Sequence, residues 1–338
     1  MNFWKKLPQP FFVLAPMANV TDAAFRQLIA KYGKPDVMYT EFVSANGLCS
    51  AGQEKLLIDL KYSKKERPIV AQVFTADPKK MFEAAILIQK LGFDGLDINM
   101  GCPDKNVVKQ GAGAALMKNP KIAAELIRAA KLGAPKLPIS VKTRIGDTKN
   151  NLAEWLPVLL KEKPAAIIIH CRTRKEMSKV PAHWDAIKQA VKIAKGTGVL
   201  IIGNGDVQDL TDARLKAEQT GCDGIMIGRG VFGNPWLFNP VYAEASAGKP
   251  KISTKKKLKI MLEHTKLFTK LLGKEKPFHI MRKHYKAYAS GFDGSKELRI
   301  KLMQTENVKD VEKIIKTTHT PSLSLFVNKK GKGARRAG

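Results

Sequence analysis

The chain has 338 residues, of which 44% are hydrophobic, enough for one large domain and a smaller one. Its 59 lysines and arginines face 30 aspartates and glutamates, so the net charge of +29 points to a polyanionic partner, nucleic acid before an acidic membrane surface. No apolar run approaches the roughly 20 residues that span a bilayer. Four separated cysteines without a Cys-x-x-Cys pair argue against disulfides and zinc, and indicate reduced thiols in a cytoplasmic protein.

From residue 11 to about residue 245, short apolar runs alternate with helical stretches. We expect Thr21 to cap the first helix, and Asp77-Pro78 and Asn119-Pro120 are start signals for two later helices. Further helices are predicted over 151–161, 184–195 and 210–220. The eight predicted strands cover residues 11–15, 37–40, 68–74, 94–99, 139–143, 165–170, 199–203 and 224–227.

Most of these strands are near-continuous apolar runs of the kind that is buried on both faces. The alternation therefore predicts a (β/α)8 TIM barrel, with a doubly wound open sheet as the alternative. In a barrel the C-terminal ends of all strands meet at one mouth, where active sites lie. The polar or flexible residues at those ends are Pro16, Met17, Ala18, Gln72, Asn99, Cys102, Lys142, His170, Asn204, Gly205, Asp206, Gly228 and Arg229.

The composition of the sequence changes near residue 249, and residues 249–338 contain 24 basic residues and 7 acidic ones. Amphipathic helices are predicted over 255–272, 277–289 and 296–316. We therefore divide the chain into a barrel domain (1–248), a small basic all-helical domain (249–325) and a basic tail (326–338). On the second helix, Arg282, Lys283 and Lys286 share one face.

Cys102 follows a predicted strand directly and lies between Gly101 and Pro103. Glycine frees the backbone on one side, and proline restricts it on the other, so the cysteine occupies a constrained turn that suits a reactive side chain. The alternative is a small buried hydrophobic residue, which is common for a free cysteine.

Two glycine-containing turns end the seventh and eighth strands, at residues 203–206 and 228–230. In barrels these loops frequently bind a phosphate through backbone N–H groups, and Arg229 adds a charged donor. Other strand ends carry Lys142, His170 and Gln72. These side chains suit a site that binds the polar edge of flavin mononucleotide (FMN) better than a site that binds a sugar phosphate. The G-x-G-x-x-G pattern of residues 228–233 follows the last strand, so it does not indicate a dinucleotide-binding turn.

Taken together, these positions resemble the FMN-dependent tRNA-dihydrouridine synthases. The matching motifs occupy residues 15–22, 72, 99–103, 142–144, 170–174, 203–206 and 228–229. The resemblance implies NADPH- or NADH-dependent reduction of the C5=C6 bond of uridine in tRNA. It further implies that a hydride passes from FMN N5 to C6 and that Cys102 protonates C5.

The resemblance also assigns roles to residues. Cys102 is the catalytic residue, and no metal is expected. A monomer that binds one tRNA is expected, with no membrane and no obligate protein partner. The implied cofactor-binding residues are Pro16, Met17, Ala18, Gln72, Lys142, His170, Asn204, Gly205, Asp206, Gly228 and Arg229. The implied substrate-binding residues are Asn99, Lys142, Arg172, Arg282, Lys283 and Lys286.

Two positions depart from the family pattern, since Asn19 and Cys171 stand where the family usually has glycine. Local accommodation is expected at both. The enzymatic alternative is an FMN-dependent small-molecule oxidoreductase of the dihydroorotate dehydrogenase type, which needs no basic helical surface. The non-enzymatic alternative is an RNA-binding protein that keeps a degenerate barrel as its scaffold.

Overall fold

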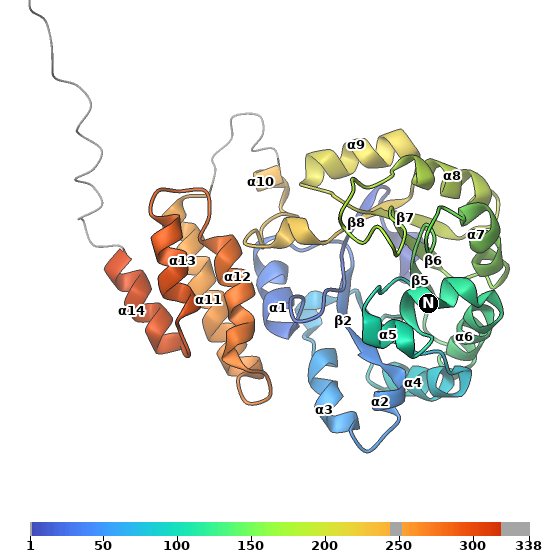
Figure 1. The fold of residues 1–338 in the computed structure, drawn as a ribbon, viewed down its shortest axis with the longest axis horizontal. Helices are drawn as coiled ribbons and strands as arrows, with labels where there is room; N and C mark the ends of the chain where they lie inside the picture. Colours follow the sequence, from blue (N-terminus) through green and yellow to red (C-terminus); the bar gives the residue numbers. More distant parts are fainter. Residues whose placement is uncertain (1, 244–251, 319–338) are drawn as a thin grey trace, which may run out of the picture.

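The computed structural model describes residues 2–243 and 252–318. Eight parallel strands form one sheet in the order β1-β8-β7-β6-β5-β4-β3-β2, and a bridge between Val13 and Val37 joins β1 to the segment that enters β2. The sheet therefore closes on itself, which confirms the predicted (β/α)8 barrel (Figure 1). The strands are β1 (Phe11–Leu14), β2 (Met38–Ser44), β3 (Ile69–Phe74), β4 (Gly95–Asn99), β5 (Ile139–Arg144), β6 (Ala166–His170), β7 (Leu200–Asn204) and β8 (Gly224–Ile227).

Helices surround the barrel in the intervals between strands (Figure 1). The Asp77 carboxylate caps α4 and the Asn119 amide caps α6, as the sequence predicts. The prediction for Thr21 is wrong, because the Asp22 carboxylate accepts the N–H of Phe25 and starts α1 one residue later. The helices of this region are α1 (Ala23–Tyr32), α2 (Ala45–Leu48), α3 (Gln53–Leu57), α4 (Pro78–Lys90), α5 (Lys105–Lys109), α6 (Pro120–Gly133), α7 (Leu152–Lys161), α8 (Asp185–Ala194), α9 (Leu210–Thr220) and α10 (Pro240–Ala243).

Apolar side chains fill the interior of the barrel toward the N-terminal ends of its strands. Trp4 is buried below the strands against Phe11, at a ring separation of 5.7 Å. Val13, Val70 and Ile168 are buried in the same cluster. This end is therefore a packed core, as is typical of such barrels.

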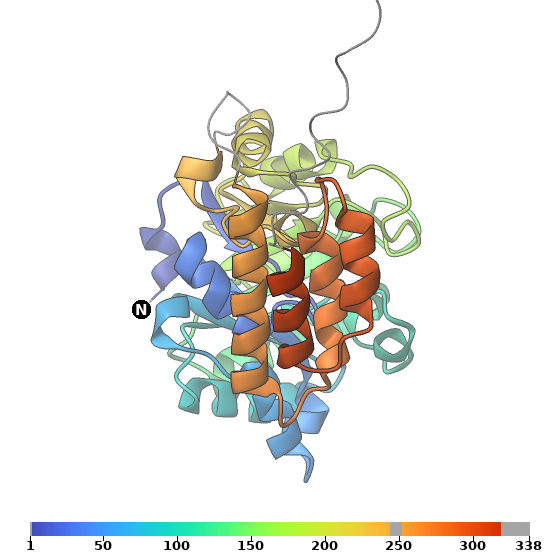
Figure 2. The same cartoon turned by 90° about the vertical axis from the view of Figure 1, so that its left-hand side faces the viewer.

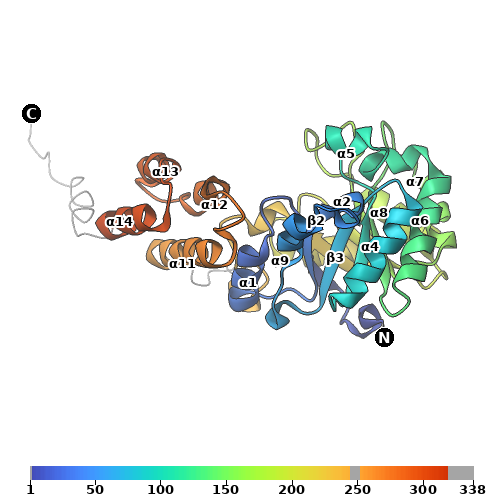
Figure 3. The same ribbon diagram turned by 90° about the horizontal axis from the view of Figure 1, so that it is seen from below.

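Four further helices lie beside the barrel, against α1 (Figures 1 and 2). Figure 3, which shows the molecule from below, places α12 and α13 nearer than α11 to the end of the barrel that carries α5. The single run predicted over 296–316 is wrong, because Asn307 accepts the N–H groups of Lys309 and Asp310 and starts a separate helix. The tail predicted over 326–338 lies outside the described residues. The four helices are α11 (Thr254–Leu272), α12 (Met281–Tyr288), α13 (Ser295–Met303) and α14 (Val308–Thr318).

An aromatic contact and an ion pair join these helices to the barrel. The Phe25 ring of α1 lies 4.9 Å from the His264 ring and 4.7 Å from the His284 ring. The Lys276 ammonium lies 2.6 Å from carboxylate oxygens of both Glu41 and Asp59. Because both side chains are less than 10% exposed, the ion pair between Lys276 and Glu41 is largely shielded from water. The junction is therefore both packed and specific.

We predict that Phe25→Ala lowers the free energy of unfolding by about 3–5 kcal/mol, because it leaves a cavity at this junction. Urea denaturation measures the change. Phe82→Ala is the matched control, since Phe82 is 39% exposed on α4 and should change stability by less than about 1 kcal/mol. Equal losses for the two variants would contradict the packing role of Phe25.

Candidate active site

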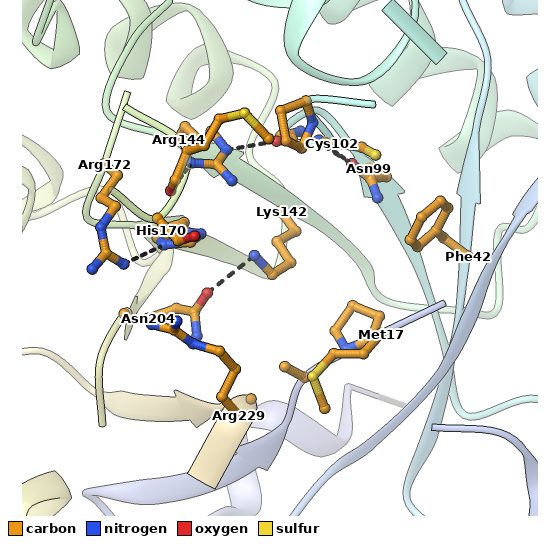
Figure 4. Close-up of a pocket in the computed structure, with 18 of the residues that line it drawn as sticks. Met17, Phe42, Asn99, Cys102, Lys142, Arg144, His170, Arg172, Asn204 and Arg229 are labelled. Atoms are coloured by element: carbon orange, nitrogen blue, oxygen red, sulfur yellow. Dashed lines mark hydrogen bonds between the residues drawn. The ribbon is translucent and has the colours of Figure 1, made fainter. Parts of the chain in front are cut away.

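A cavity of about 370 Å³ opens at the C-terminal ends of the strands (Figure 4). Ala18 does not line it, and Arg282, Lys283 and Lys286 lie apart from it on α12. The described residues contain no group of three or more His, Cys, Asp or Glu that could hold a metal. The predicted residues that do line the cavity are Pro16, Met17, Gln72, Asn99, Cys102, Lys142, His170, Arg172, Asn204, Gly205, Asp206, Gly228 and Arg229.

Cys102 lies on the turn that follows β4, at the edge of the cavity. Its N–H donates to Asn99 Oδ1 at 2.9 Å, and its carbonyl accepts the N–H of Ala114 at 3.0 Å. The returning segment lies so close that a Cβ at Gly113 would fall 2.8 Å from the Cys102 oxygen. Burial raises the pKa of the Cys102 thiol above its ordinary value, so the sulfur keeps its proton at neutral pH. The cavity thus holds a protonated thiol rather than a thiolate.

A chain of buried hydrogen bonds runs beneath this turn. Asn99 Nδ2 donates to Gln72 Oε1 at 3.0 Å, and Gln72 Nε2 donates to Asp97 Oδ2 at 2.7 Å. Ser140 donates to the other Asp97 oxygen at 2.6 Å, and the Tyr39 hydroxyl lies 3.2 Å from Ser140. Burial raises the pKa of Asp97 to about 7. A carboxyl group that titrates near neutrality therefore lies under the cavity.

Two cations contribute positive charge to the cavity. Lys142 donates to Asn204 Oδ1 at 3.2 Å, and burial lowers its pKa to about 8. Arg144 donates through Nε to the Gly101 carbonyl at 2.8 Å, and burial lowers its pKa to about 10. Within the described ranges, neither side chain forms a salt bridge with a carboxylate. The pair therefore favours an anionic ligand.

His170 lies beside these cations and stays neutral. Burial lowers the pKa of His170, and the nearby charges of Lys142 and Arg144 lower it further. Arg172 Nη1 lies 3.3 Å from His170 Nε2, so the neutral ring nitrogen can accept that hydrogen bond. His170 therefore offers a neutral polar edge to the cavity.

The turns after β7 and β8, which the sequence predicts to bind an anion, line one side of the cavity. Asp206 has a φ of +48° and pairs with both Arg172 and Arg229. In the part of the chain that the structure describes, the N–H groups of Asp206, Gly228 and Arg229 have no protein acceptor. Figure 4 shows Arg229, Asn204, His170 and Lys142 around one open space. Free N–H donors beside a guanidinium fit a phosphate.

The two departures from the family pattern are accommodated. Asn19 has a φ of +54°, a left-handed conformation that asparagine tolerates, and its N–H donates to Glu41. Cys171 is fully buried behind the cavity, and burial raises its pKa to about 12. Cys171 is therefore a protonated thiol outside the cavity.

Several residues that line the cavity have no role predicted from the sequence, among them Phe42, Arg144 and Met177. The sequence contains a signal for Arg144, because it lies two positions after Lys142 and alternate residues of a strand share a face. Phe42 was missed because β2 extends to Ser44, beyond the predicted residue 40. Met177 belongs to an irregular loop, where no periodicity indicates which side chains face the cavity.

Comparison with known proteins identifies the family. A model of the dihydrouridine synthase family matches residues 13–322. The chain belongs to the dihydrouridine synthase family. A probable tRNA-dihydrouridine synthase 2 of Bacillus subtilis (strain 168) is 42% identical over 319 residues, covering 93% of this chain and 95% of the relative. A probable tRNA-dihydrouridine synthase of Staphylococcus aureus (strain COL) is 40% identical over 323 residues, covering 93% and 94%.

Solved structures support the fold alone. A 6-hydroxypseudooxynicotine amine oxidase from Pseudomonas geniculata N1 matches with a TM-score of 0.52 at 15% identity, over 70% of this chain and 47% of that chain. A 2-naphthoyl-CoA reductase matches with a TM-score of 0.53 at 10% identity, over 71% of this chain and 50% of that chain.

Dihydrouridine synthases are oxidoreductases, so this chain is an enzyme of that class. No helix among the described residues has the length and apolar character needed to cross a membrane.

The raised pKa of Asp97 predicts a pH-dependent stability. The folded state binds an extra proton between about pH 4 and pH 7, so the stability that Asp97 contributes is full below about pH 4 and is lost as the pH rises through 7. Asp97→Asn removes this titration. We compare the free energy of unfolding of the variant with that of the unchanged protein. This difference should favour the variant by roughly 2–3 kcal/mol more at pH 8 than at pH 5.

Urea denaturation at both pH values tests this prediction. Asp185→Asn controls for the loss of one negative charge, because the Asp185 carboxylate is 96% exposed. If the stability difference between Asp97→Asn and the unchanged protein is the same at pH 5 and pH 8, Asp97 does not titrate in this range.

Proposed function

We propose that this enzyme reduces the C5=C6 bond of uridine in tRNA to 5,6-dihydrouridine, with FMN in the cavity and NADPH or NADH as reductant. The observation that carries the proposal is the position of Cys102, a protonated thiol on a fixed turn at the edge of a cation-lined cavity. The membership of the dihydrouridine synthase family supports it. A small-molecule oxidoreductase of the dihydroorotate dehydrogenase type has no comparable support.

The donors in the cavity fit FMN. The N–H groups at Asp206, Gly228 and Arg229 would hold the phosphate, and the polar ends of Lys142 and His170 would hold the edge of the ring. When bound, reduced FMN supplies the hydride that goes to uracil C6, and the nicotinamide reductant restores the cofactor. Lys142 keeps its charge below about pH 8 and would stabilise negative charge at that edge.

In this proposal Cys102 delivers a proton to C5 while C6 receives the hydride. The base is thereby reduced by two hydrogens, and the sulfur regains its proton from solvent. Asn99 accepts the Cys102 N–H, which fixes the backbone of the turn that carries the thiol. A thiol whose pKa is raised by burial releases a proton only to a strongly basic position, such as a carbon that gains negative charge as the hydride arrives.

The helices α11–α14 would provide the tRNA-binding domain, as proposed for residues 249–325. Lys283 and Lys286 are exposed on α12 and would contact phosphates in a salt-dependent way. The target uridine must leave its stack to enter a cavity at the end of the barrel. We propose further that one monomer binds one tRNA in the cytoplasm.

Cys102→Ala should leave FMN bound and lower the rate of dihydrouridine formation by about 100-fold or more, because a positioned general acid contributes at least that much. Single-turnover assays on tRNA that lacks dihydrouridine measure the rate. Cys171→Ala serves as the control, since that thiol lies outside the cavity. Full activity in Cys102→Ala would eliminate the proposed acid.

Arg229→Ala should weaken FMN binding by about tenfold or more, because it removes a charge-assisted contact to the phosphate. Flavin stoichiometry after gel filtration gives the readout. Arg128→Ala is matched to it, since Arg128 is similarly exposed and also pairs with one carboxylate, that of Glu162. Unchanged flavin content in Arg229→Ala would refute the phosphate assignment.

The double variant Lys283→Glu/Lys286→Glu should weaken tRNA binding. The plot of log affinity against log salt concentration, which has a negative slope, should become less steep by about 2. Affinities are measured by filter binding at several salt concentrations. Lys64→Glu/Lys65→Glu makes the same charge change before β3, at the opposite end of the barrel from the cavity. A comparable loss in both double variants would show a general charge effect and not a specific surface.

A further inference from the structure

We propose that Asp97 is a positioning residue for Cys102, acting through the side-chain amides of Gln72 and Asn99. None of the contacts described above requires Asp97 to touch a substrate or a cofactor. Asp97 is fully buried on β4, and it is not among the residues that line the cavity. Its connection to the site is the chain of hydrogen bonds beneath the turn.

The last link of that chain is the Asn99 amide. Asn99 Oδ1 accepts the N–H of Gly101 at 3.1 Å and the N–H of Cys102 at 2.9 Å. One side-chain oxygen therefore holds two successive N–H groups of the turn. It can do so only when its Nδ2 points the other way, toward Gln72 Oε1. The position of the Cys102 backbone thus depends on the orientation of one amide.

An amide pair alone does not fix this orientation. If both the Gln72 and Asn99 amides turned over, their mutual hydrogen bond would survive with donor and acceptor exchanged. The Asn99 NH₂ group would then face the N–H groups of Gly101 and Cys102, and those buried donors would lose their acceptor. Something outside the pair must select one of the two arrangements.

Asp97 makes that selection, because its Oδ2 accepts from Gln72 Nε2 at 2.7 Å. A carboxylate oxygen accepts hydrogen bonds and has no hydrogen to donate. Gln72 must therefore direct its NH₂ group toward Asp97 and its oxygen toward Asn99. Ser140 occupies the other Asp97 oxygen, next to Tyr39. When Asp97 is protonated, the proton can lie on the Ser140 side, and Oδ2 continues to accept.

The reactivity of Cys102 toward iodoacetamide tests the inference in the full-length protein. Peptide mass spectrometry gives the alkylation rate of each cysteine separately. Asp97→Ala should speed alkylation of Cys102 by about fivefold or more, because the turn loses its fixed acceptor and the sulfur becomes more accessible. Asp97→Asn, whose oxygen can still accept from Gln72, should stay within about twofold of the unchanged protein.

A double variant tests the route. Asn99→Ala removes the acceptor itself, so adding Asp97→Ala to it should cause no further change if Asp97 acts through Asn99. The buried Cys171 and Cys222 report unfolding and should stay unlabelled. Should Asp97→Ala label them, Gln72→Met gives the same test at the next link and should also speed alkylation of Cys102.

Three results would overturn the inference. They are an unchanged Cys102 rate in Asp97→Ala or Gln72→Met, an Asp97→Asn rate as fast as that of Asp97→Ala, and additive effects in the double variant. The catalytic consequence rests on the proposed role of Cys102, but the alkylation rates do not. A protein that fails to reduce tRNA can therefore still confirm the positioning, and an active one can refute it.

Discussion

Closure of the parallel sheet is the constraint on which the rest of the structure depends. Because all eight strands point the same way and β1 meets the segment that enters β2, every strand delivers its last residue to one end of the barrel. Residues as distant in sequence as Met17 and Arg229 thereby face the same cavity (Figure 4). The interior of the other end is filled by apolar side chains around Trp4.

The cavity combines two positively charged side chains with a thiol whose pKa is raised. Lys142 is partly buried and Arg144 is buried, and neither forms a salt bridge with a carboxylate among the described residues. This arrangement costs free energy unless an anion binds. Cys102 lies in the same cavity, where burial outweighs the nearby cations and keeps its thiol protonated. A site of this kind suits a step in which an anionic cofactor gives up a hydride and the product gains a proton elsewhere.

Local sequence signals predicted the barrel well, because buried parallel strands are apolar runs and helix starts such as Asp77-Pro78 are local. Features set by distant partners were not predictable. The end of β2 depends on its pairing with β3, where Ser44 lies opposite Phe74, some 30 residues later in the chain. Thr21 and Asp22 are both good caps, and only the folded turn decides between them. Asp97 looked like an ordinary strand residue until its hydrogen-bond partners were known.

The most direct test of the proposed reaction is nucleoside mass spectrometry of tRNA that lacks dihydrouridine, incubated with the purified protein and NADPH. We predict that one or more uridines gain the mass of two hydrogen atoms, and that the gain depends on Cys102 and on bound flavin. If flavin is bound and several tRNAs are tested without any gain, the assignment of uridine in tRNA as substrate is wrong.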